Sequence, residues 1–301
     1  MNFFKKITFI LIVATSFLVV VSCNSSKEES QDEPQKAAGV NKEEVTIYYS
    51  NWAETIAMTK VTKLALEEVG VKVKTYLLGP GAMYASLAKG EGDIFLESWL
   101  PQTHAEYWKK YGEKLDKVST SFDNASTGLV VPKYVDINSI DELNAHKEKF
   151  NGKIIGIGSG AGVHKDTEKA IEEYNLDFEQ ITSSGPAMVT SLKKAIMKED
   201  WVVITGWKPH FKWAKYDLKY LKDPKSVYPK EKAWIVTRKG FTNERPGFKT
   251  FLNNFHLSDM QVADLMLTFE DMDDEEKAAK KWYQENKEMI QGWMPEEWLK
   301  E

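Results

Sequence analysis

"GDIFLESWLPQTH", residues 92–104, and "WVVITGWKPH", residues 201–210, share one layout. In each stretch an apolar run of strand length ends on a tryptophan, and a proline stands two residues further on. Trp99 and Trp207 lie 108 residues apart. A tryptophan at a strand end, followed by a residue that breaks regular structure, is poorly placed for ordinary core packing. The two stretches therefore indicate a repeated unit with a special role for its tryptophan.

Other positions repeat at nearly the same interval. Ile47 and Ile155 are 108 residues apart, and Met83 recurs as Met188 after 105. Around them strand-like and helix-like patterns alternate, which is typical of an α/β protein. The expected order is strand, helix, strand, helix, strand in the first half, at 44–52, 55–70, 71–78, 81–92 and 93–99. In the second half it is strand, helix, helix, strand, at 152–160, 163–175, 187–199 and 201–207.

Four segments follow strands in this scheme. They are "SNWAET", "ESWLPQTH", "GSGAGVHKD" and "TGWKPH". Ligands of α/β sheets bind outside the carboxyl ends of the strands. The four segments can converge on one ligand only if the two halves face each other across a cleft.

Trp52, Trp99 and Trp207 stand on three of these segments. An indole face attracts a cation without a donor hydrogen, by about 0.5–2 kcal/mol per contact. Such a cage suits a quaternary ammonium group, whereas a primary amine would lose its hydration and find no acceptor. Any one of these side chains alone is more simply explained by core packing, but three at matched strand ends favour a cation cage.

The fourth segment carries Gly158, Gly160 and Gly162 directly before a helix expected to start near Val163. Glycines let the backbone approach a ligand closely, and free N–H groups at a helix start favour an anion. The alternative is a plain tight turn. The spacing matches neither the dinucleotide fingerprint nor the P-loop.

His104, five residues after Trp99, is a candidate donor to a carboxylate. The histidines show no metal-ligand spacing and Cys23 is the only cysteine, so neither a metal nor a cofactor is expected. His210 in "TGWKPH" could serve as a base, but no nucleophile motif accompanies it. The sequence contains no convincing catalytic constellation.

Composition narrows the class further. The chain has 301 residues, of which 42% are hydrophobic and 28% charged, with a formal net charge of −5. That is an ordinary globular composition, and the mildly acidic balance argues against a nucleic-acid partner.

The N-terminus reads as a secretory signal, residues 1–22, with two lysines before a short apolar run. The stretch around Cys23 resembles a bacterial lipobox, which implies cleavage before Cys23 and attachment of lipid to its sulfur. The alternative is a cleaved signal with an incidental cysteine. Residues 23–41 then form a polar tether, so the protein is expected in the cell envelope, outside the cytoplasm and anchored to a membrane.

Taken together, the motifs resemble the substrate-binding proteins of glycine betaine ABC transporters. The resemblance rests on "NWAETIAMT", "GDIFLESWLPQTHAEYW", "GLVVPKYVDINSIDELN", "IIGIGSGAGVHKDTEKA", "ITGWKPHFKWAKYDLKYLKDPK" and "RKGF". It implies an α/β, two-lobed periplasmic-binding-protein fold of type II, with the ligand cleft between lobes joined by two crossings. Lobe I is expected at 42–132 plus 226–301, and lobe II at 133–225.

The resemblance also implies roles for single residues. The three-tryptophan prism falls on Trp52, Trp99 and Trp207. Contacts to the ligand carboxylate fall on the backbone N–H groups of Gly162 and Val163 and on His104. The chain departs from many relatives in its glycine loop, where Gly158 and Gly160 flank Ser159.

The expected function is that of a monomeric, lipid-anchored receptor that passes glycine betaine, or a close zwitterion, to a separate ABC permease. The same fold could instead take choline, carnitine or proline betaine. Two other classes of protein are alternatives: an exported enzyme using His104 or His210, and a structural or adhesive lipoprotein.

Overall fold

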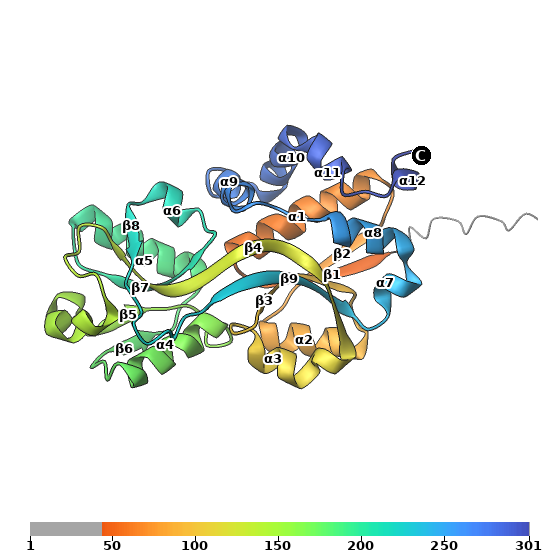
Figure 1. Cartoon of the computed structure of the whole chain (residues 1–301). Helices are drawn as coiled ribbons and strands as arrows, with labels where there is room; N and C mark the ends of the chain where they lie inside the picture. The colour runs from red at the N-terminus through yellow and green to blue at the C-terminus, as the bar shows by residue number, and fades with distance from the viewer. Residues whose placement is uncertain (1–43, 301) are drawn as a thin grey trace, which may run out of the picture. The chain divides into compact units, whose positions relative to one another are not determined.

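The described residues, 44–300 of a computed structural model, belong to one compact unit built around a mixed sheet (Figure 1). The predicted signal, Cys23 and the tether lie outside the described residues. The strands are β1 Val45–Tyr49, β2 Val73–Leu77, β3 Ile94–Leu100, β4 Leu115–Pro132, β5 Lys153–Ile155, β6 Glu179–Ile181, β7 Val203–Lys208, β8 Leu218–Tyr220 and β9 Lys230–Arg238. The longer helices are α1 Ala53–Glu68, α2 Pro80–Lys89, α4 Gly162–Glu173, α5 Gly185–Lys198, α8 Pro246–Asn254, α9 Asp259–Glu270 and α10 Glu275–Glu285.

Short helices complete the described chain. They are α3 Ala105–Tyr111, α6 Lys212–Lys215, α7 Phe241–Glu244, α11 Lys287–Gln291 and α12 Glu296–Leu299, with 3₁₀ segments at Gly112–Lys114 and Ile140–Phe150. No helix among residues 44–300 combines the length and the apolar character needed to cross a membrane.

The predicted repeat is present in the sheet topology. Strand β1 pairs in parallel with β2 and β3, and β5 pairs in parallel with β6 and β7. Each three-stranded unit is connected through two helices, so the predicted order is confirmed in the first half. In the second half the four predicted elements are present, but the three-residue strand β6 between the two helices was not predicted. The peptide bonds Leu100–Pro101 and Lys208–Pro209, at matching places in the two units, are both cis.

Two long antiparallel strands, β4 and β9, connect the units (Figure 1). Strand β4 pairs with β9 from Leu115 to Ser126 and with β7 from Ser126 to Val130. The sheet order is β2-β1-β3-β9-β4-β7-β5-β6, with β8 beside β4. The type II binding-protein fold is confirmed. The lobe boundaries after residues 132 and 225 stay a prediction. Near these positions, β4 changes its pairing partner from β9 to β7 at Ser126, and β9 begins at Lys230.

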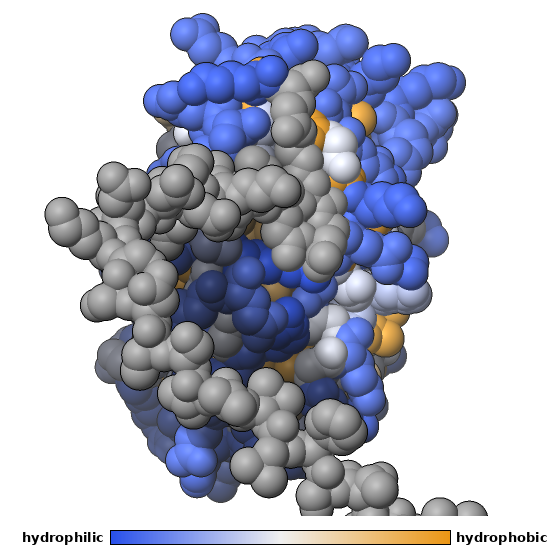
Figure 2. Space-filling view, turned by 90° about the vertical axis from the view of Figure 1, so that its right-hand side faces the viewer, coloured by the Kyte–Doolittle hydropathy of each residue, from blue (hydrophilic) through white to orange (hydrophobic). Residues whose placement is uncertain are grey.

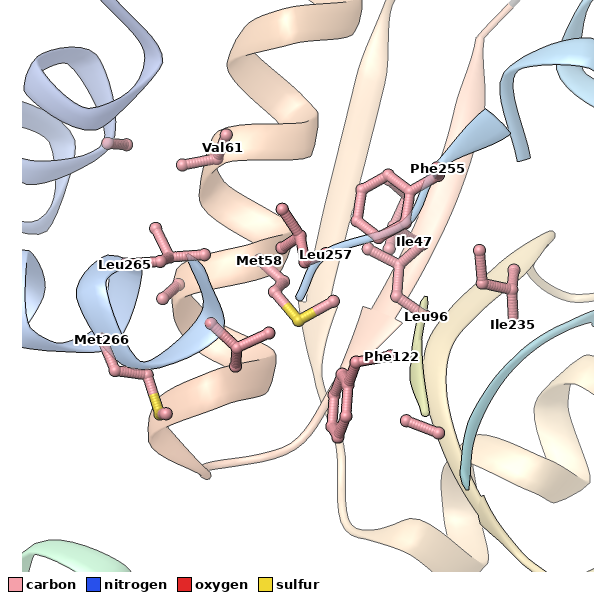
Figure 3. Close-up of a cluster of buried hydrophobic side chains, with 14 of the residues drawn as sticks. Ile47, Met58, Val61, Leu96, Phe122, Ile235, Phe255, Leu257, Leu265 and Met266 are labelled. Carbon is pink, nitrogen blue, oxygen red and sulfur yellow. The ribbon is translucent and has the colours of Figure 1, made fainter. Parts of the chain in front are cut away.

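The core follows this division. One apolar cluster is made only of residues between 129 and 227, including Leu129, Ile154 and Val203. In the other unit the helices α1 and α9 cover the sheet, and Val61 of α1 points towards Leu265 of α9, while Met58 points away from α9 (Figure 3). A third cluster surrounds Tyr84 and Phe95 beneath α2.

The largest apolar cluster is continuous between the two units. It contains Trp99 from β3 and Ala161, Val163 and Trp207 from the second unit. Continuous apolar packing of this kind requires the two units to be in close contact, as in a shut form of the protein.

Most large apolar side chains lie in the interior. Figure 2 shows a face on which hydrophilic residues predominate and hydrophobic ones appear in small separate spots. The exposed large apolar residues are Tyr76, Leu77, Tyr134, Met197, Met260 and Leu299. Of these only Tyr76 and Leu77 are neighbours in sequence, at the end of the edge strand β2.

Candidate ligand-binding site

All six residues predicted to contact a ligand line one cavity of about 30 Å³. The cavity is lined by Trp52, Glu54, Trp99, Thr103, His104, Thr127, Ile157, Ala161, Gly162, Val163 and Trp207. A larger groove, of about 800 Å³, runs along β4 and β9 and contains none of the six. The smaller cavity is the better candidate, because aromatic faces and polar groups from both units converge on it.

The three tryptophans reach the cavity from three elements. Trp52 is the residue before α1, Trp99 lies near the end of β3, and Trp207 lies near the end of β7. Trp99 and Trp207 are each only 4% exposed. Trp99 packs edge-on against Phe122, with ring centroids 5.8 Å apart. Their positions follow from the sequence, since a strand that ends at the sheet edge directs its last residues towards the cleft.

His104 is held in one tautomer by Trp99. The backbone N–H of Trp99 donates to Nδ1 of His104 over 2.9 Å, so the ring proton belongs on Nε2. That Nε2 atom is buried and has no hydrogen-bond partner among the described residues. Burial lowers the pKa of His104 to about 3, so the ring is neutral at physiological pH. His104 therefore presents an unpartnered N–H donor at the cavity.

The first turn of α4 supplies further donors. Helix α4 begins at Gly162, and the first N–H groups of a helix have no acceptor within it. Within residues 44–300 no acceptor is found for the N–H groups of Gly162 and Val163. The backbone here lies against the other unit: a Cβ atom on Gly162 would stand 2.0 Å from the carbonyl oxygen of Thr103. Only glycine fits this contact.

Glu54 is a cavity residue that the sequence analysis did not identify. Its Oε2 accepts a hydrogen bond of 3.1 Å from Nε1 of Trp207, which links the two units. Burial raises the pKa of Glu54 to about 7, although the bond from Trp207 and the charge of Lys212 oppose the rise. The signal was present as a glutamate two residues after Trp52, but an acid in the first turn of a helix is ordinary and draws no attention.

Two more ionisable groups are buried behind the cavity wall. Lys212 places Nζ 4.0 Å from the Trp207 ring centroid and donates to the Trp207 carbonyl over 3.3 Å. Glu97, on β3, is fully buried, and neither carboxylate oxygen has a partner in the described part of the chain. Burial and the neighbouring Glu54 raise the pKa of Glu97 well above its usual range.

A turn from Pro101 to His104 carries His104 to the cavity, and Glu231 of β9 holds it. Oε1 of Glu231 accepts from the backbone N–H groups of Gln102 and Thr103 over 2.6 and 2.7 Å, and Oε2 accepts from the Thr103 hydroxyl. Glu231 is 4% exposed. Because it binds three donors of one turn, it fixes the place of both His104 and the Thr103 carbonyl.

His210 lies outside this cavity. Its Nδ1 accepts from the backbone N–H of Lys212 over 3.1 Å, and its ring packs edge-on against Trp207. Burial lowers its pKa well below the usual range. Its contacts are those of a structural residue. No group of three or more potential metal ligands occurs among the residues that the structure describes.

Comparison with known proteins decides the family. Residues 43–285 match the OpuAC family, the substrate-binding domain of ABC-type glycine betaine transport systems. The chain belongs to the OpuAC family. It is therefore a substrate-binding protein of ABC transport and not an enzyme, which removes the catalytic alternative based on His104 or His210.

Several solved OpuAC-type structures are similar to this chain. Lactococcal OpuAC, in its closed form complexed with glycine betaine, is 34% identical, with a TM-score of 0.80 over 84% of this chain and 100% of that one. The glycine betaine/L-proline-binding protein ProX of Borrelia burgdorferi is 32% identical, with a TM-score of 0.81 over 85% and 98%. A choline-binding protein in complex with choline is 26% identical, with a TM-score of 0.76 over 83% and 91%.

A curated relative is similar over a shorter range. It is the glycine betaine/carnitine transport binding protein GbuC of Listeria monocytogenes, 39% identical over 150 residues, which are 48% of this chain and 50% of the relative. The chain thus spans about half the length of the curated relative that it matches.

Proposed function

We propose that this protein is the extracytoplasmic receptor of an ABC importer and that it binds glycine betaine, or a close quaternary-ammonium carboxylate, in the cavity described above. It would deliver this osmoprotectant to a separate permease. The observation that carries the proposal is the convergence of three indoles and three unpartnered N–H donors on one cavity. A zwitterion with a methylated ammonium group complements both sets.

The cationic end of the ligand fits the tryptophan side of the cavity. Trp52, Trp99 and Trp207 offer π faces to the trimethylammonium group, whose charge is spread over methyl groups. Glu54 adds a carboxylate to the same wall. Burial raises its pKa in spite of the charge of Lys212, and a bound cation would favour the ionised carboxylate further.

The anionic end fits the donors. The N–H groups of Gly162 and Val163 stand at the positive end of the α4 dipole, where a carboxylate is favoured. Nε2 of His104 adds a third donor from the opposite unit. Because the two groups of donors come from different units, a carboxylate bound to both stabilises the closed form.

Choline is the main alternative ligand, since a similar solved structure binds it. Choline has a hydroxyl in place of the carboxylate and can accept at most two hydrogen bonds, so at least one of the three donors would stay buried without an acceptor. An unmade buried hydrogen bond costs about 1–3 kcal/mol. The donors therefore favour a carboxylated ligand. Proline betaine and carnitine also carry both charged groups and stay candidates.

Titration calorimetry with glycine betaine, proline betaine, carnitine, choline and tetramethylammonium tests the proposal. The expected result is tight binding of glycine betaine and binding of choline and tetramethylammonium weaker by at least about tenfold, which corresponds to about 1.4 kcal/mol. No heat with any of the carboxylated ligands, or equal affinity for choline and glycine betaine, would refute it.

The remaining parts of the proposal concern the whole receptor. Attachment of lipid to Cys23 would keep it at the membrane, and a tether over residues 23–41 would let it reach the permease. It would act as a monomer with lobe I at 42–132 plus 226–301 and lobe II at 133–225. The separate apolar cluster between residues 129 and 227 supports this division.

A further inference from the structure

A second contact between the units lies outside the ligand cavity and centres on Asp166 of α4. Its Oδ1 accepts a hydrogen bond of 3.1 Å from Nε2 of Gln102, in the turn after β3. The second oxygen, Oδ2, is buried and has no partner among the described residues, and the side chain as a whole is 5% exposed. A half-satisfied carboxylate is thus enclosed where the two units meet.

The surroundings of Asp166 give it little support as an anion. Across the contact stands a second carboxylate, Glu231 of β9, which is fully engaged with the turn. The Tyr228 hydroxyl, from the loop before β9, is nearby and donates instead to Thr167. The positive charges that act on Asp166 are Lys165 and Lys169 of its own helix, and both are exposed.

We propose that Asp166 is a positioning residue that latches the two lobes through Gln102 in the ligand-bound form, and that this latch is stronger when Asp166 is protonated. The proposal rests on the proposed function, because it concerns closure around the ligand. Opening separates Gln102 from Asp166 and returns the carboxylate to water, whereas closing buries it beside Glu231. Burying an incompletely paired carboxylate is unfavourable, and a proton removes that cost.

The direction of the effect follows from linkage. In the closed form burial, with the charge of Glu231, raises the pKa of Asp166 to about 6, against the bond from Gln102. In the open form the group should have its ordinary value of about 3.9. At a pH between these two pKa values, closure of the protein is therefore accompanied by uptake of a proton on Asp166. The contribution of Asp166 to closure is most favourable below about pH 4, is lost as the pH rises to about 6, and stays lost above that.

The variant Asp166→Asn separates this effect from other titrations. Asparagine keeps an oxygen that accepts from Gln102 but carries no charge at any pH. His104 and Glu54 are not among the groups that act on Asp166, so they titrate in both proteins, and the ratio of wild-type Kd to variant Kd at each pH reports Asp166 together with its neighbour Glu231, whose pKa burial also raises. Since one pKa unit corresponds to a tenfold change, this ratio should fall by a factor of about three to ten between about pH 7.5 and pH 5.

The experiment is calorimetric titration of glycine betaine into both proteins at the two pH values, with Glu172→Gln as the matched control. Glu172 is an exposed acid on the same helix, and the ratio of wild-type Kd to the Kd of Glu172→Gln should not change with pH. A ratio for Asp166→Asn that is independent of pH would overturn the proposal, even if the variant binds more weakly or more tightly throughout. Absence of betaine binding by the wild-type protein would instead refute the proposed function.

Discussion

Replacement of Gly162 by alanine tests whether ligand binding requires the close contact between α4 and the turn after β3. The added Cβ would lie 2.0 Å from the Thr103 carbonyl oxygen and 2.5 Å from the Thr103 C and Cα atoms. Ordinary contacts of a Cβ atom begin at 3.4 Å, so the two backbones must separate by more than an ångström. The turn cannot easily retreat, because Glu231 holds it through three hydrogen bonds.

The magnitude follows from this geometry. Overpacking of a well-packed contact costs about 1–3 kcal/mol, and the cost falls on the closed form alone. The Kd for glycine betaine, measured by titration calorimetry, should therefore rise by a factor of about five to about a hundred. Folding without ligand should be little affected, because Gly162 does not have a positive φ and alanine suits the first turn of a helix.

The glycine loop offers matched controls. A Cβ on Gly158 would meet no atom within 4 Å, and one on Gly160 would come no closer than 3.6 Å to Pro80. Alanine at either position should leave the Kd within about twofold of wild type, well under the cost of overpacking. The reasoning is wrong if Gly162→Ala binds as tightly as these controls, or if all three variants weaken binding equally.

Three further predictions concern the charges of the ligand and the anchor. Glu54→Gln keeps an oxygen that can accept a hydrogen bond from Trp207 but removes the negative charge, so the affinity for glycine betaine should fall at least about tenfold. The affinity for 3,3-dimethylbutanoate, the analogue of glycine betaine with an uncharged carbon in place of the nitrogen, should not fall. Parallel losses of affinity for both ligands would contradict this prediction. His104→Ala should weaken the binding of glycine betaine about tenfold or more and that of tetramethylammonium less, because the carboxylate contact is lost whereas the cation side loses only the stacking of His104 on Trp52. Competition titration measures both affinities, and equal losses would argue against the assigned role. Cys23→Ala should release the protein from the membrane fraction after cell fractionation, and continued membrane association would exclude the lipid anchor.

The regular elements and the fold class were accessible from the sequence because the signals are local. Apolar runs of strand length and helical periodicity mark elements in both halves, and glycines end the two helices of the first half. The matched placement of Trp99 and Trp207 then indicated that the two halves face each other. His104 and Gly162 were found because their sequence neighbours mark a strand end and a helix start.

The long-range partners were not accessible in the same way. Glu231 stands 129 residues from Gln102 along the chain, and nothing in its local pattern distinguishes it from a surface glutamate. The same holds for Glu54, Glu97 and Lys212, since charged residues are rarely buried and a local pattern predicts them at the surface. Strand β4 was not predicted, because polar residues interrupt its first half.

The bond from the Trp99 amide to His104 has a consequence for which solutes the site accepts. Trp99, which lines the part of the cavity proposed for the methylated nitrogen, also fixes the orientation of His104, the proposed donor to the carboxylate. One short piece of backbone therefore sets the separation at which both ends of a solute are recognised, and neither end can adjust alone. We expect the affinity for dipolar solutes to depend first on the length of the spacer between their opposite charges, and only then on the substituents that the spacer carries.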